Sequence, residues 1–279
     1  MKTAIAFGIF DGLHAGHRAV LEATAGCKRT AVTFSDPPKF DDKDHRQLMS
    51  LEDRKKGLME LGMDAVECLS FEYYKDMSPE EFLDFITEHF EVCKIACGFN
   101  FRFGKNASGN TETMKKYCEE KGIELICADP VKKDGKVISS SLIRDYISKG
   151  DISAANELLL YPFGFKAEVL SGDKRGRQIG FPTINQLIPR ELVIPKLGVY
   201  KSSVILNGKK YRSVTNIGHR PTYKTENVTA ETHIMDFSGD IYGKEVTVLP
   251  ENFLREEKKF SSLDELKKAI KNDCSEVIK

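Results

Sequence analysis

Several patterns that mark particular protein classes are missing from this sequence. It has no tryptophan, and its 42 Lys and Arg residues balance 42 Asp and Glu residues. No polybasic run occurs, which argues against nucleic acid or an anionic membrane as the main partner. No apolar run is long enough for a membrane span, and the N-terminal stretch is interrupted too soon for a signal peptide.

The cysteines predict no disulfide framework. There are seven, an odd number without paired spacing, so we expect reduced thiols and a cytoplasmic location. Cys93 and Cys97 have a spacing that a metal pair could use, but they flank Ile95-Ala96 in an expected strand. Small buried side chains are the favoured interpretation of both. The 41% hydrophobic and 30% charged content is typical of a globular protein, and 279 residues suffice for two domains.

The first 150 residues alternate between strand and helix patterns. Such alternation predicts an α/β domain with a doubly wound parallel sheet, in which ligands bind at the carboxyl ends of strands. Ser78, Pro79 and Glu81 give one helix its N-cap, first turn and capping box. The expected strands cover 3–10, 29–34, 65–71, 93–99 and 122–128, and the expected helices cover 17–25, 51–61, 79–90 and 111–121.

A further helix is expected over 141–160, and the pattern changes after it. Pro162 and Gly164 break the helix, so we place one domain at 1–160 and a second at 161–279. Short strands separated by turn signals such as Asn207-Gly208 predict a C-terminal antiparallel β-barrel. A terminal helix begins at the capping box Ser262 to Glu265. The expected strands cover 165–171, 198–206, 210–217, 230–237 and 244–249.

The segment from Gly8 to His17 places a glycine-rich turn after an apolar strand and before a helix. His14 and His17 share one face of that helix, whose first turn offers backbone N–H groups and the positive end of the dipole. The combination predicts a polyphosphate site without a Walker lysine, and it resembles the nucleotidyltransferases. A loop with two surface histidines is the plainer alternative. The predicted ATP-binding residues here are Gly8, Phe10, Asp11, His14, Gly16 and His17.

The segment from Gly98 to Lys105 nearly reproduces a P-loop. Five residues rather than four separate its glycines, and asparagine follows the lysine, so the match fails. Asn100 and Arg102 could instead reach phosphates, while the interleaved phenylalanines face an aromatic ligand or the core. An edge strand with core phenylalanines is an equal alternative.

Three serines and an arginine mark the start of the helix expected at 141. Hydroxyl groups at a helix start either cap the helix or, with an arginine three residues on, hold a triphosphate. For any single serine, capping alone is the favoured interpretation. The predicted ATP-binding residues here are Ser139, Ser140, Ser141 and Arg144.

The second domain carries its own glycine-rich segment. Three glycines spaced four apart precede Pro-Thr-x-Asn, and glycines let a backbone wrap a phosphate chain. Thr183 and Asn185 project to one side of an extended strand, and their oxygens are hard ligands suited to Mg²⁺. A basic turn before a barrel strand is the plainer alternative. The predicted ATP-binding residues are Gly172, Lys174, Gly176, Gly180, Pro182 and Thr183, and the predicted metal ligands are Thr183 and Asn185.

In combination, these segments resemble the bacterial bifunctional riboflavin kinase/FMN adenylyltransferase family. The three N-terminal motifs match in order and spacing, with Ser141 in place of the family's usual threonine. The match continues through Glu231-Thr-His233 and Phe253-Leu-Arg255. The resemblance implies that Glu231 is the kinase general base, that Mg²⁺ and ATP bind near Thr183, and that Arg255 lies in a loop over the flavin.

The resemblance also implies a two-step transferase. The barrel phosphorylates riboflavin with ATP to give FMN, and the N-terminal domain then joins FMN to an adenylyl group from ATP, releasing pyrophosphate. Expected partners are riboflavin, FMN and ATP, with Mg²⁺ as cofactor, no nucleic acid and no membrane, in a monomer or weak homo-oligomer. The implied catalytic residues are Glu231, His14, His17, Asn100 and Arg144, aided by Ser140, and the implied flavin-binding residues are Asn100, Arg102, Phe103 and Arg255.

Other functions remain open. A nucleotidyltransferase acting on an alcohol phosphate or phosphopantetheine leaves Glu231 and the segment 182–185 unexplained. A single surviving activity, either kinase or adenylyltransferase, is a second alternative. A flavin-binding regulatory protein predicts losses at catalytic positions, and Ser141 is the only change found there.

Overall fold

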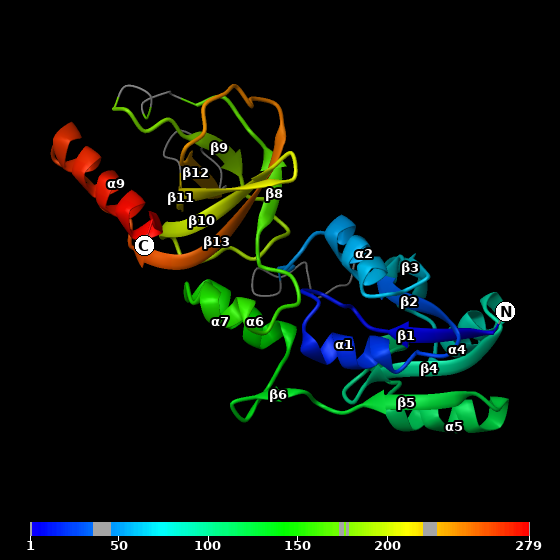
Figure 1. The fold of residues 1–279 in the computed structure, drawn as a ribbon. Coiled ribbons are helices and arrows are strands. Elements are labelled where there is room, and N and C mark those ends of the chain that lie inside the picture. The colour runs from blue at the N-terminus through cyan, green and yellow to red at the C-terminus, as the bar shows by residue number, and fades with distance from the viewer. Residues whose placement is uncertain (1, 36–45, 173–175, 177–178, 220–227, 279) are drawn as a thin grey trace. The chain divides into compact units, whose positions relative to one another are not determined.

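The computed structural model describes residues 2–35, 46–172, 176, 179–219 and 228–278 (Figure 1). They fall into two units, one made of Met1–Leu142 and Leu158–Tyr161, the other of Ile143–Glu157 and Pro162–Lys279. The chain therefore enters the second unit, returns briefly to the first and leaves it again.

The first unit contains five parallel strands in the order β3-β2-β1-β4-β5, which confirms the predicted doubly wound sheet. The expected strand 3–10 ends at Phe7, because Phe10 and Leu13 have φ of 54° and 38°, outside the range of strands. The alternative of an edge strand with core phenylalanines for 98–105 is wrong about the strand, because β4 ends at Gly98 and is an interior strand, but it is right that Phe103 lies in the core. The strands are β1 (Thr3–Phe7), β2 (Lys28–Phe34), β3 (Ala65–Leu69), β4 (Val92–Gly98) and β5 (Glu124–Ala128).

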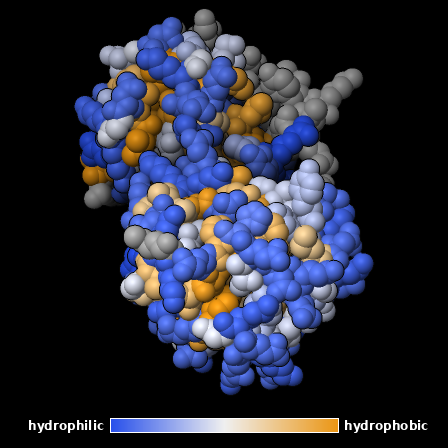
Figure 2. All heavy atoms as spheres, turned by 90° about the vertical axis from the view of Figure 1, so that its right-hand side faces the viewer, coloured by the Kyte–Doolittle hydropathy of each residue, from blue (hydrophilic) through white to orange (hydrophobic). Residues whose placement is uncertain are grey.

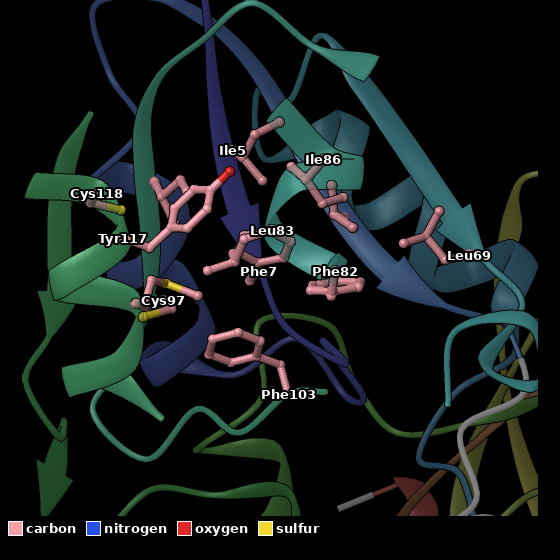
Figure 3. Close-up of a cluster of buried hydrophobic side chains, with 13 residues drawn as sticks. Ile5, Phe7, Leu69, Phe82, Leu83, Ile86, Cys97, Phe103, Tyr117 and Cys118 are labelled. Carbon is pink, nitrogen blue, oxygen red and sulfur yellow. The ribbon is translucent and has the colours of Figure 1, made fainter. Parts of the chain in front are cut away.

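Apolar clusters cover both faces of this sheet. On one face, residues of α4 and α5 pack against the strands, and Figure 3 shows Phe7, Phe82 and Phe103 converging there from three different elements. On the other face, α1 and α2 contribute. The predicted capping box is confirmed, with Ser78 Oγ accepting the Glu81 N–H at 3.2 Å. The helices are α1 (Ala15–Glu22), α2 (Leu51–Glu60), α3 (Phe71–Tyr74), α4 (Pro79–His89), η3 (Lys105–Ala107) and α5 (Thr111–Lys121).

The single helix expected over 141–160 is wrong. A short hairpin, β6 (Lys132–Lys133) and β7 (Lys136–Val137), comes first, and two helices follow: α6 (Ser140–Ser148) and α7 (Ile152–Asn156). Gly150 between them has φ of 84°, which ends a helix, and Asp151 caps the next by accepting the Ala154 N–H at 3.2 Å.

The second unit is an antiparallel sheet of six strands in the order β8-β13-β10-β11-β12-β9. Its outer strands meet where Leu170 N–H donates to the Asn185 carbonyl at 2.8 Å, so the predicted barrel is nearly closed. Hydroxyl groups of Ser202, Thr215 and Thr232 form a buried hydrogen-bond chain in this sheet. The strands are β8 (Phe165–Glu168), β9 (Ile184–Leu187), β10 (Gly198–Leu206), β11 (Lys209–His219), β12 (Val228–Ile234) and β13 (Glu245–Arg255).

Local signals in the barrel are confirmed in part. Asn207 and Gly208 both have positive φ and join β10 to β11, as the hairpin cue predicts. β13 continues past the expected end at residue 249, because a register shift accommodates Pro250. The terminal helix α9 (Leu263–Ile278) begins as expected, although the Glu265 carboxylate accepts from the Ser261 N–H rather than from Ser262.

The surface and the thiols add two observations. Hydrophilic residues cover most of the face drawn in Figure 2, with smaller apolar areas between them. No helix among the described residues is both long and apolar enough to cross a membrane. All seven cysteines are free, and on β4 Cys97 is fully buried while Cys93 is half-buried.

Candidate active sites

The loop after β1 is held in a compact conformation by its own residues. Phe10 and Leu13 have positive φ, and their side chains are completely buried. A Cβ at Gly8 would lie 2.8 Å from the Phe10 ring, so this position requires glycine. The predicted ATP-binding residues Gly8 and Phe10 therefore shape the loop from within.

Hydrogen bonds connect this loop to two other segments. The buried Asp11 carboxylate accepts the Leu48 N–H at 2.8 Å, and the Asp11 carbonyl accepts the Ser140 hydroxyl at 2.8 Å. A Cβ at Gly16 would lie 3.6 Å from the Ile138 carbonyl. The structure thus brings the sequence motifs at 8–17 and 138–140 together in the first unit.

His14 and His17 form a stacked pair at the start of α1. His14 is the N-cap, His17 is the third helical residue, and each Nδ1 accepts the other's backbone N–H at 3.4 Å. The ring centroids are 3.7 Å apart. The His17 N–H is therefore occupied, whereas the sequence interpretation treated the first-turn N–H groups as free.

The protonation state of His17 follows from its surroundings. Burial lowers its pKa well below the usual value, and the charges of His14 and Arg54 lower it further. A neutral imidazole whose Nδ1 accepts a hydrogen bond carries its proton on Nε2. His17 is thus a hydrogen-bond donor through Nε2, and a hydrogen bond to an ionised phosphate is strong even when the donor is neutral.

The serines after β7 have different local environments. Ser139 Oγ accepts the Leu142 N–H at 3.3 Å, as expected for a cap, and Ser140 binds the β1 loop as described. Ser141 is exposed. Arg144 lies on α6 within the second unit, so its predicted role beside the histidines stays a prediction.

The run that follows β4 is a turn. Phe101 stacks on Phe7 at 5.5 Å, which places this turn beside the end of β1. Asn100 and Arg102 are exposed, and their ligand contacts stay predictions. Phe103 is only 6% exposed and lies in the core (Figure 3), so its ring supports the turn and offers a flavin little surface. Phe99, 47% exposed, is the aromatic ring of this run that lies at the surface.

In the barrel, a carboxylate lies between two amides. Glu231 on β12 is paired with Asn185 on β9 and with Asn216 on β11. Residues directly opposite in antiparallel strands share one face of the sheet, with Cβ atoms about 5 Å apart. Asn185 is 8% exposed and Glu231 is half-buried. Asn216, which also donates to the Glu257 carboxylate at 2.9 Å, was not predicted as a site residue.

The segment before β9 lies against the same face. A Cβ at Gly176 would lie 2.3 Å from the Phe181 carbonyl and 3.4 Å from Thr183 Oγ1, so glycine permits this close turn. His233, two residues after Glu231 on β12, donates from Nδ1 to the Pro182 carbonyl at 2.8 Å. His233 thereby fixes the backbone next to Thr183, a role that the sequence did not reveal.

The remaining predicted residues of the glycine-rich segment are less constrained. Gly180 is exposed with φ of 84°, Pro182 is exposed and Gly172 is half-buried. Lys174 lies outside the described residues.

Arg255 was expected in a loop over the flavin, and the loop is wrong. It is the last residue of β13, and its Nε and Nη2 bind the Asp273 carboxylate of α9 at 3.0 and 2.8 Å. Its guanidinium also lies 5.7 Å from the Phe260 ring. Arg255 therefore ties the terminal helix to the barrel, and its contact with flavin stays a prediction.

Arg54, whose guanidinium contacts the loop after β1, was not singled out from the sequence. It is 1% exposed and donates to the carbonyls of Ile9 and Phe34. Arg54 lies within the charged run 52–56, which by itself indicates a solvated helix face, so the sequence did not suggest that this residue is buried. The available signal was helical spacing, because Arg54 shares the buried face of α2 with Gly57 and Leu58.

Two family models match separate parts of the chain. A family model described as FAD synthetase matches residues 1–142, and one described as riboflavin kinase matches residues 159–279. Bifunctional riboflavin kinase/FMN adenylyltransferases of Listeria monocytogenes and Bacillus subtilis are each 33% identical, over 98% and 100% of this chain and 90% and 92% of their own length. The Escherichia coli protein is 34% identical over 96% of this chain and 90% of its own.

A solved structure from Streptococcus pneumoniae, named as a macrolide-efflux protein, has the same fold throughout. It superposes with a TM-score of 0.89 at 28% identity, covering 98% of this chain and 92% of that one. The relatives that match along nearly the whole chain and the two family models name the same two activities. The chain therefore belongs to the bifunctional riboflavin kinase/FMN adenylyltransferase family.

Proposed function

We propose that the two activities of this family are carried out at the two sites described above. The first unit transfers an adenylyl group from ATP to FMN, and the barrel phosphorylates riboflavin. The observation that carries the first assignment is the histidine pair at the start of α1, which offers a ring donor where a phosphate chain would meet the positive end of the helix dipole.

Adenylyl transfer at this site needs no strong base. The FMN phosphate is already an anion near neutral pH and attacks the α-phosphate of ATP, so pyrophosphate leaves. The protein positions the two phosphates and stabilises the charge that develops. We assign this role to His14 and His17, with Asn100 and Arg144 as further contacts and Ser140 holding the loop in place.

Glu231 is the general base of riboflavin phosphorylation in this proposal. It accepts the proton of the ribityl 5′-hydroxyl as that oxygen attacks the γ-phosphate of ATP. Strand pairing places Asn185 and Asn216 on either side of this carboxylate. Thr183 lies against the tight turn at Gly176, where the ATP phosphates are expected.

The oxygens around Glu231 fit a magnesium ion bound together with ATP. Thr183 and Asn185 supply hard neutral oxygens, and Mg²⁺ prefers a few such ligands with phosphates and water. Among the described residues, no group of three His, Cys, Asp or Glu side chains could hold a metal alone. In this proposal the ion binds together with the nucleotide and would neutralise charge on the phosphates.

The proposal extends to the boundary between the two activities, the location of the protein and its oligomeric state. We place the functional boundary at the predicted junction of 1–160 and 161–279, near the last point where the chain leaves the first unit at Tyr161. A cytoplasmic location suits the free thiols and a need for ATP. A monomer or weak homo-oligomer suffices, because each proposed site is drawn from a single chain.

Product analysis tests the proposal directly. Purified protein with riboflavin, ATP and Mg²⁺ should accumulate FMN and then FAD on chromatography, with pyrophosphate released in step with FAD. Supplied FMN should give FAD without riboflavin. Failure to form FAD from FMN would contradict the first assignment, and failure to form FMN would contradict the second.

A further inference from the structure

Among the described residues, Arg54 on α2 is the largest fully buried side chain, with 1% of its surface exposed. Arginines are almost never buried to this extent unless they are paired, because desolvating the charge is costly. Among the described residues, its Nε has no hydrogen-bond partner. This environment lowers the pKa of the guanidinium through burial, although the nearby Asp11 carboxylate opposes that effect.

The guanidinium connects the carboxyl ends of two neighbouring strands. Nη1 donates to the Ile9 carbonyl at 2.7 Å, in the loop after β1, and Nη2 donates to the Phe34 carbonyl at 3.0 Å, at the end of β2. The Thr33 hydroxyl donates to the same Ile9 carbonyl at 2.9 Å. The peptide just before the positive-φ residue Phe10 is therefore held by two donors.

The charge of Arg54 also reaches the histidine pair. Its Coulomb interaction with His17 favours the neutral imidazole, and its interaction with Asp11 balances part of the charge. Folding alone gives little reason for this arrangement, because an apolar side chain of similar size at this buried helix position would avoid the desolvation cost.

We propose that Arg54 is a positioning residue for adenylyl transfer, which holds the loop from Gly8 to His14 in its reactive conformation and supplies a buried positive charge beneath the anionic nucleotide. The inference rests on the proposed adenylyl transfer in the first unit. Arg54 acts through the loop backbone and His17 rather than by contact with the reacting atoms.

Replacement of Arg54 provides the test. Arg54→Met removes both hydrogen bonds and the charge, and kcat for FAD formation from FMN should fall about 10²-fold or more, as small misplacements at active sites do. The KM for FMN should change much less, and the kinase rate of the same protein should be unchanged. Arg54→Lys keeps the charge but cannot donate to both carbonyls in the geometry of a guanidinium. Its kcat for FAD formation should lie between those of Arg54→Met and the original protein. Lys56→Met, on the exposed face of α2, is the matched control and should behave as the original protein does.

A second readout separates positioning from mere stability. The pKa of His17, followed by NMR titration of its ring protons, should rise in Arg54→Met and stay low in Arg54→Lys. A folded Arg54→Met protein with a near-normal kcat for FAD formation would overturn the proposal, as would an unchanged His17 pKa. If Arg54→Met does not fold, the kcat of Arg54→Lys for FAD formation is the deciding measurement. A normal kcat in that variant would overturn the positioning role. Absence of FAD formation in the unmodified protein would instead contradict the proposed function.

Discussion

The two sites of this protein are built in different ways. The central part of the proposed adenylyltransferase site is one loop and a helix start, contiguous in sequence from Gly8 to His17, at the carboxyl end of β1. The proposed kinase site is a row of side chains across three antiparallel strands, where strand register alone places Asn185, Asn216 and Glu231 side by side. The first depends on local backbone conformation, and the second depends on long-range pairing.

The difference predicts how each site tolerates change. The loop is held by buried groups beneath it, so a single substitution at Arg54 or Gly8 acts on the whole loop. The barrel row is supported from the other face of its strands, where the Thr215 and Thr232 hydroxyls are 2.9 Å apart and buried. A register slip of one residue would turn Glu231 to that inner face, so the pairing itself maintains the site.

The largest effect is expected from replacing both histidines with alanine. Two hydrogen bonds to ionised phosphate, each worth about 1.5–3 kcal/mol, are lost, so FAD formation from FMN should fall by roughly two to four decades. The kinase rate should be unchanged, which makes it an internal control. A lower melting temperature with a normal specific FAD rate would show that His14 and His17 are structural instead.

Glu231→Gln is the corresponding change in the barrel. It keeps size and hydrogen bonding but removes the base, so FMN formation should fall about 10²–10⁴-fold. FAD formation from supplied FMN should stay within twofold of the original protein. Loss of both activities in a folded variant would mean that Glu231 does not belong to the kinase site alone.

Truncation tests whether the kinase site is self-contained. A fragment of residues 143–279 should make FMN and no FAD, because it keeps α7, which caps itself through Asp151 and belongs to the barrel unit. A shorter fragment of residues 160–279 should also make FMN but melt at a lower temperature. Inactivity of both fragments, despite a folded circular dichroism spectrum, would contradict two independent sites.

Asp273→Asn separates the structural and flavin-binding roles of Arg255. Removing the carboxylate leaves the guanidinium facing an amide, and the barrel unit should lose about 1–3 kcal/mol of unfolding free energy. The KM for riboflavin should change little, and denaturant unfolding with steady-state kinetics measures both. A large rise in KM with unchanged stability would favour the flavin contact.

The smallest effect is a pH dependence of stability in the first unit. The folded-state pKa of His17 is lowered by burial, so above the unfolded-state value, about 6.5, both states are neutral and the stability is fully present. As pH falls below that value, the unfolded state takes up the proton first and stability is lost. Between pH 7.5 and 5.5, the melting temperature of His17→Gln should decline less than that of the original protein. Equal declines would contradict the lowered pKa.

The architecture could be predicted from the sequence more fully than the side-chain contacts could. The alternation of strand and helix patterns over the first 150 residues predicted the parallel sheet, and the strand, turn and helix order around His14 indicated the candidate histidine site, because both signals are local in sequence. Local capping signals at Ser78 and the Asn207-Gly208 turn were equally readable. Gly150 was not recognised as a helix end, because a lone glycine in an apolar pattern is also compatible with a continuous helix.

Contacts between residues that are distant in sequence could not be predicted from the sequence. The pairing of Asn216 with Glu231 depends on strand register, and Arg54 is buried by a loop distant in sequence. The partner of Arg255 lies 18 residues away on a separate helix, so its ion pair could not be inferred from its own motif. The glycine-rich segment before β9 indicated a candidate site, but the role of His233 could be inferred only from its hydrogen bond to Pro182 in the structure.

Mixing two inactivated variants tests the central claim of two separate sites most directly. The His14→Ala/His17→Ala protein should convert riboflavin to FMN and stop there, and Glu231→Gln should make FAD only from supplied FMN. An equimolar mixture with riboflavin, ATP and Mg²⁺ should form FAD, because FMN released by one protein is the substrate of the other. A mixture that forms no FAD, although each variant keeps its own activity, would contradict freely exchanging sites. Loss of both activities in either folded variant would contradict the division itself.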